Sequence, residues 1–161
     1  LLCSSSKFFQ AATKDEWDAL RPGDQKQTVT VEFEPDLFKS YVHWLYSGTI
    51  PRPDNDEPSF DYYEYLARLY VMGEEIMDIS FKNVLLENFA AMTLRGSNNG
   101  THRYPGRTTI CIIYQGTIKE SPLRRMVVGM YSALARENWH FQGLPEEAMV
   151  DILRAMAQRR P

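Results

Sequence analysis

The stretch from Phe38 to Ile50 combines a helical pattern of apolar residues with a marked end, and it constrains the fold more than any other part of the chain. Its apolar residues recur at intervals of 3, 4, 7 and 8, which places them on one face of an α-helix. These residues are Phe38, Tyr41, Val42, Leu45 and Tyr46. Because this face is largely aromatic, we expect other elements to cover it. The chain must therefore build a core around this helix.

Both ends of this helix are marked in the sequence. Pro35 suits the first helical position, because the N–H that proline lacks would have no partner there. Asp36 places negative charge in the first turn, where the helix dipole favours it. Gly48 follows the last turn and can adopt the left-handed conformation that ends many helices. The sequence therefore predicts a helix that begins near Pro35 and ends near Tyr46.

Apolar spacing predicts further helices before and after this one. They cover residues 1–12, 62–76, 79–93, 121–139 and the segment from residue 144 onward. Residues 28–33 alternate between apolar and polar side chains, which predicts a strand with one wet face. Residues 108–114 are rich in β-branched side chains, so strand and helix both remain open there.

The order and spacing of several motifs resemble BTB/POZ domains, in particular those of filamentous fungi. In the central helix the resemblance is carried by Phe38, Tyr41, Trp44, Leu45, Tyr46, Ser47, Gly48 and Ile50. Further matching segments are residues 65–73, 81–84, 113–114 and 121–126. Each motif by itself is unspecific, and the resemblance rests on the order and spacing of the motifs along most of the chain.

The resemblance implies an α+β fold that is predominantly α-helical. We expect a BTB/POZ-like helical core over residues 1–95, a flexible loop over residues 96–107 and a C-terminal helical extension over residues 108–161. BTB domains begin with strands and a helix that this chain largely lacks, so we expect an N-terminally incomplete domain. Its short residual strand would then have an exposed edge that can pair with another chain. The residues of that edge are Val29, Val31 and Phe33.

The composition argues against several classes of protein. With 43% hydrophobic and 24% charged residues it is typical of soluble globular proteins. No apolar run approaches the ~20 residues that a membrane span needs. The net charge of −3 is uneven, since residues 1–101 hold 9 Lys/Arg and 16 Asp/Glu and residues 102–161 hold 9 and 5. The excess of Lys/Arg over Asp/Glu in residues 102–161 is too small for a nucleic-acid-binding surface. We expect neither nucleic acid nor membrane among the partners, and a cytoplasmic or nuclear protein.

The sequence contains no constellation typical of catalysis or metal binding. His43, His102 and His140 lie far apart, and Cys3 and Cys111 are not at metal-ligand spacing. Neither a nucleophile elbow nor a glycine-rich phosphate loop occurs. We therefore expect no metal and no cofactor.

These observations predict a non-enzymatic protein–protein interaction module that acts through homodimerisation or as an adaptor. A substrate adaptor for a cullin-based ubiquitin ligase is an alternative, and a small enzyme that uses the helix at residues 62–70 as a pocket wall is another. In BTB domains the outer side of the central helix contributes to docking on cullin scaffolds. The resemblance therefore implies partner-binding positions at Lys39, Ser40 and His43, with Trp44 at the border of that face.

Overall fold

The computed structural model describes residues 1–14, 29–52, 61–94, 104–134 and 141–159. Within these ranges the chain forms helices and no strand. The helices are α1 (Leu2–Ser5), α2 (Lys7–Ala12), α4 (Pro35–Ser47), α5 (Tyr62–Glu75), α6 (Ile79–Leu94), α7 (Arg107–Gly116), α8 (Pro122–Leu134) and α9 (Glu146–Gln158). The predicted predominance of helix is confirmed.

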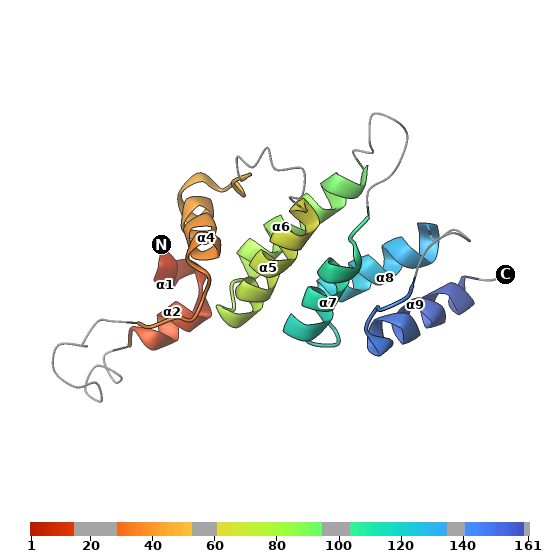
Figure 1. The fold of residues 1–161 in the computed structure, drawn as a ribbon. Coiled ribbons are helices and arrows are strands. Elements are labelled where there is room, and N and C mark those ends of the chain that lie inside the picture. Colours follow the sequence, from red (N-terminus) through yellow and green to blue (C-terminus); the bar gives the residue numbers. More distant parts are fainter. Residues whose placement is uncertain (15–28, 53–60, 95–103, 135–140, 160–161) are drawn as a thin grey trace.

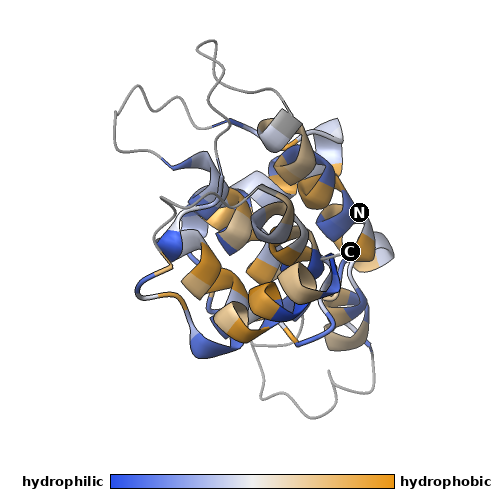
Figure 2. Ribbon diagram, turned by 90° about the vertical axis from the view of Figure 1, so that its right-hand side faces the viewer, coloured by the Kyte–Doolittle hydropathy of each residue, from blue (hydrophilic) through white to orange (hydrophobic). Residues whose placement is uncertain are grey.

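The helices form one array with α5 and α6 at its centre. Figure 1 shows α1, α2 and α4 on one side of this pair and α7, α8 and α9 on the other. Buried residues from both sides belong to a single apolar cluster. Figure 2 shows hydrophobic and hydrophilic residues interleaved along the helices, as in helices that bury one face. Helix α5 is therefore covered by α4, α6 and α7.

Asp78 holds the junction between α5 and α6, and its side chain is completely buried. Its Oδ1 accepts the backbone N–H of Phe81 at 3.0 Å, which caps α6. Its Oδ2 accepts the hydroxyl of Tyr41 in α4 at 2.9 Å and also the hydroxyl of Ser5 in α1. Burial, together with the carboxylate beside it, raises the pKa of Tyr41 well above its ordinary value. The hydroxyl of Tyr41 therefore stays protonated and keeps donating its hydrogen bond to Asp78.

The turn that presents Asp78 is a Schellman motif with an unusual residue in its left-handed position. The N–H of Asp78 donates to the carbonyl of Gly73 at 3.2 Å, and that of Met77 donates to the carbonyl of Glu74 at 3.2 Å. Met77 has a φ of 53°, where glycine is usual and another residue costs about 1–2 kcal/mol. The chain thus accepts local strain where α5 turns into α6.

Helix α4 buries a face that is rotated from the predicted one. Tyr41 is fully buried as expected, but Trp44 is only 8% exposed and its ring stacks on Tyr41 at a centroid distance of 5.8 Å. Both rings contact Phe81 of α6, at 4.9 and 5.0 Å. Tyr46, which was predicted to face inward, is 79% exposed. The apolar residues of α4 fit two overlapping stripes, and the contact with α6 selects the stripe that contains Trp44.

The strand predicted over residues 28–33 is not formed in the described part of the chain, where residues 29–34 are irregular. A strand needs a partner for its backbone groups, and no backbone hydrogen bond joins residues 29–33 to another described residue. The alternation itself is present, because the polar side chains between the apolar ones are exposed. The apolar side chains pack partly buried against the core instead of forming an exposed edge. They are Val29, Val31 and Phe33.

Residues 108–114 are helical, which resolves the choice that the sequence left open. Ile110 and Ile113 are fully buried on the face of α7 that joins the common core. Packing on α5 therefore outweighs the strand propensity of the β-branched residues. The predicted loop over residues 96–107 lies mostly outside the described residues, so the boundary between core and extension stays a prediction.

Replacing Gly116 by alanine should destabilise the packing of α7 on α5. A Cβ at this position would lie 2.4 Å from a methyl carbon of Val71, and we expect Gly116→Ala to lower the free energy of unfolding by about 1–3 kcal/mol. Gly129 in α8 is the matched control, because a Cβ there meets no atom within 4 Å. Gly129→Ala should raise stability by up to about 1 kcal/mol. Urea unfolding measures both, and equal effects would contradict this packing.

Removing Asp78 should cost more than removing an ordinary helix cap. Asp61 is the matched control, because it is exposed and also caps a helix. Its carboxylate accepts the backbone N–H of Tyr63 in α5 at 2.9 Å. We expect Asp61→Ala to cost about 1 kcal/mol. Asp78→Ala should cost about 3–5 kcal/mol, since it also leaves the buried hydroxyl of Tyr41 without its acceptor. Similar losses in thermal or urea unfolding would show that Asp78 is no more than a cap.

Candidate functional site

The structure divides the predicted partner-binding residues of α4 into an exposed pair and a buried pair. Lys39 and His43 are exposed, as predicted. Ser40 is only 8% exposed, and its hydroxyl donates to the carbonyl of Asp36 at 2.8 Å. Trp44 belongs to the core, as described above. Ser40 and Trp44 therefore lie on the inner side of α4, whereas the sequence pattern placed Ser40 on the outer face and Trp44 at its border.

The outer face of α4 instead combines Lys39, His43 and Tyr46. These residues are spaced by four and then three positions, which places them on one line along the helix. Lys39 forms an ion pair of 2.8 Å with Asp36, and both side chains are exposed, so the pair contributes little to stability. Tyr46 is the missed residue of this face. Extending the line from Lys39 and His43 by one turn would have found it.

Helix α4 is held firmly enough to present this face in a fixed orientation. The hydroxyl of Tyr65 in α5 donates to Ser40 at 2.8 Å and lies 3.2 Å from the carbonyl oxygen of Pro51. At the end of the helix Gly48 has a φ of 70°, and its N–H donates to the carbonyl of Trp44 at 2.8 Å. The predicted left-handed stop is confirmed. Tyr46 therefore projects from the last turn of an anchored helix.

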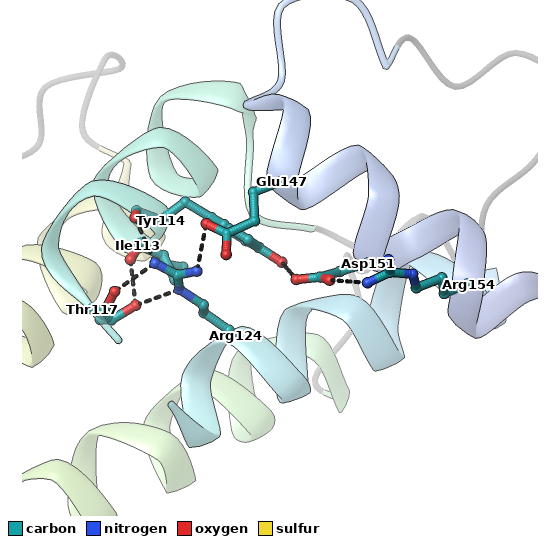
Figure 3. A network of polar contacts seen from close by, with 7 residues as sticks. All are labelled: Ile113, Tyr114, Thr117, Arg124, Glu147, Asp151 and Arg154. Carbon is teal, nitrogen blue, oxygen red and sulfur yellow. Dashed lines mark hydrogen bonds and ion pairs between the residues drawn. The ribbon is translucent and has the colours of Figure 1, made fainter. Parts of the chain in front are cut away.

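A second polar centre, which the sequence did not indicate, surrounds Arg124 in α8 (Figure 3). Its guanidinium donates to the carbonyl of Tyr114 at 2.7 Å and to the hydroxyl of Thr117 at 3.0 Å. It also pairs with Glu147 of α9 at 2.8 Å and lies 4.4 Å from the ring centre of Tyr114. One buried cation therefore joins the C-terminus of α7 to both α8 and α9.

The tyrosine of this centre extends it toward α9. Tyr114 donates its hydroxyl to Asp151 at 3.2 Å, and Asp151 lies 4.0 Å from Arg154. Burial, and then the charge of Asp151, raises the pKa of Tyr114 well above its ordinary value, so the hydroxyl remains a donor. The donors of Arg124 are directed at groups of this chain. We interpret the centre as a clamp between helices.

The tyrosines of α5 contribute mainly to packing and hydrogen bonding. Tyr63 and Tyr70 are buried in the core, and the ring of Tyr63 lies 5.4 Å from that of Phe89.

In the ranges that the structure covers, no three metal-ligating side chains cluster. In the same ranges no helix has both the length and the apolar character to cross a membrane.

Comparisons of the chain with protein-family models, with curated proteins and with solved structures gave no match. The resemblance to BTB/POZ domains therefore remains an interpretation of the sequence.

Removing the cation of the clamp should destabilise the C-terminal helices. Arg124→Met leaves the carbonyls of Tyr114 and Thr117 and the hydroxyl of Thr117 without their donor, and we expect a loss of about 3–5 kcal/mol. Glu147→Gln is the control, because this carboxylate is 47% exposed and its loss should cost less than about 1 kcal/mol. Urea unfolding compares the two. If Arg124→Met were as mild as Glu147→Gln, the clamp would not hold these helices together.

Proposed function

We propose that this chain is a non-enzymatic protein-interaction module of the BTB/POZ type, and that it binds protein partners through the outer face of α4. One observation carries the proposal. Tyr46 is 79% exposed at the end of a firmly held helix, on the same line as Lys39 and His43. Tyrosine is enriched among the residues that dominate protein–protein affinity, because its rigid ring buries a large area at little entropic cost.

The resemblance to BTB/POZ domains adds to this proposal from the sequence side. The helix that carries the exposed line is also the helix in which the resemblance is most specific. A helix with an aromatic and two polar side chains on its outer face is suited to a partner with an apolar pocket and a polar rim. A second copy of the chain and an unrelated protein are both partners of this kind.

A substrate adaptor for a cullin-based ubiquitin ligase is the narrower candidate within this proposal. It is favoured by the exposure of Lys39 and His43, because the outer side of the corresponding helix contributes to cullin docking in BTB domains. A small enzyme is the less favoured alternative. Two of the tyrosines expected to line its pocket, Tyr63 and Tyr70, are buried in the core and take part in holding the helices together.

Tyr46→Ala should weaken partner binding without affecting the fold. The side chain is almost free of intramolecular burial, so we expect the free energy of unfolding to stay within about 0.5 kcal/mol of the parent. Loss of a central aromatic contact should raise the Kd for a partner at least about tenfold. Sedimentation equilibrium measures this for a second copy, and calorimetric titration measures it for a purified cullin scaffold.

A photo-reactive phenylalanine analogue at position 46 identifies the partner when neither of these binds. The same analogue at position 87, which is exposed on α6, is the control. We expect a discrete crosslink from position 46 that unlabelled parent chain competes away and that the Tyr46→Ala chain does not. Identical crosslinks from both positions would contradict docking through α4.

A further inference from the structure

A groove on the molecule lies between the start of α4, helix α5 and helix α7, apart from the line of Lys39, His43 and Tyr46. Its volume is about 240 Å³, and it is bordered by residues 32–34 of the irregular segment. The floor is apolar and comes from three elements that are distant in the sequence. The apolar lining residues are Phe33, Leu37, Val71, Met72 and Ile112.

The rim of this groove is acidic. Among the described residues, Glu32, Glu34 and Glu75 line it together with one cation, Arg68. Arg68 is engaged, because it pairs with Glu34 at 3.0 Å and with Glu64 at 2.9 Å. Glu32 and Glu75 are exposed and form no ion pair with another described residue. Within the described part of the chain, the rim therefore carries negative charge that no cation pairs with, beside an apolar floor.

The segment that borders the groove resembles a strand in its side chains and is irregular in its backbone. Residues 29–33 make no backbone hydrogen bond to another described residue, although their side chains alternate between core and solvent as in a strand. Backbone donors and acceptors in such a segment are a template for an added strand. Glu32 lies on the solvent side of this alternation, where cross-strand neighbours of an added strand would meet it.

We propose that this groove and residues 29–33 together bind an extended segment of a partner protein in which apolar and basic side chains alternate. The backbone of the partner adds as a strand beside residues 29–33. Its apolar side chains enter the groove, and its basic side chains lie over the rim near Glu32 and Glu75. This proposal goes beyond the proposed function, because none of the exposed residues of α4 lines the groove.

Synthetic peptides test the partner chemistry directly. The probe is a short peptide in which valine and lysine alternate. One control peptide alternates valine with glutamate, and another has the lysines and valines of the probe in two blocks. By fluorescence polarisation we expect the probe to bind at least about tenfold more tightly than either control, and its affinity to fall as salt is raised. Equal binding of the three peptides, or no binding of the probe, would overturn the proposal.

Surface variants test the location. Glu32→Gln combined with Glu75→Gln removes negative charge from the rim, and we expect it to weaken binding of the probe about three- to tenfold. Glu87→Gln removes the same kind of charge from α6 and should leave binding unchanged, as should Tyr46→Ala. The Tyr46→Ala chain thus separates failure of this site from failure of the α4 face. Undiminished binding by the double variant would place the peptide elsewhere and overturn the proposal.

Amide hydrogen exchange tests the strand addition. Bound probe should slow the exchange of the backbone N–H groups of residues 29–33 at least about tenfold, because pairing protects them from solvent. Binding that left exchange in this segment unchanged would overturn the strand geometry.

Discussion

A single buried carboxylate, that of Asp78, determines how the N-terminal half of this molecule is assembled. A carboxylate that leaves water must receive hydrogen bonds or become protonated, since an isolated buried charge is very costly. Asp78 receives them from the N-terminus of α6, from Tyr41 in α4 and from Ser5 in α1. The three donors belong to different helices, so the position of each helix is fixed relative to the others by the need to satisfy one side chain.

Arg124 has the complementary role in the C-terminal half. Asp78 places negative charge at the N-terminus of α6, and Arg124 places positive charge at the C-terminal carbonyls of α7. Both arrangements satisfy backbone groups that a helix end leaves unpaired, and both agree with the helix dipole. Between these centres the contact of α5 with α7 is apolar and close, as Gly116 against Val71 shows. Polar contacts thus set the ends of the helices, and the apolar core joins the two halves.

Helix α4 links this architecture to the surfaces of the molecule. Its inner side carries Tyr41 and Trp44 into the core, its outer side exposes Tyr46, and its first turns border the acidic groove through Leu37. A partner on the outer face would contact a helix that is anchored through Tyr41. A partner in the groove would contact the irregular segment that precedes the same helix. The two surfaces can therefore be occupied and tested independently.

The sequence by itself determined the features whose interactions span a few residues. Pro35 and Gly48 mark the ends of α4 because the backbone conformation that each favours acts within one turn. The apolar spacing that defines α4, α5 and α6 is equally local. Tertiary structure decided the rest. It selected which stripe of α4 is buried, and so exchanged Tyr46 for Trp44. It made residues 108–114 helical through packing on α5, and it left residues 29–33 without a paired strand. Each of these outcomes depends on which element lies opposite, and the pattern of one segment holds no information about that neighbour.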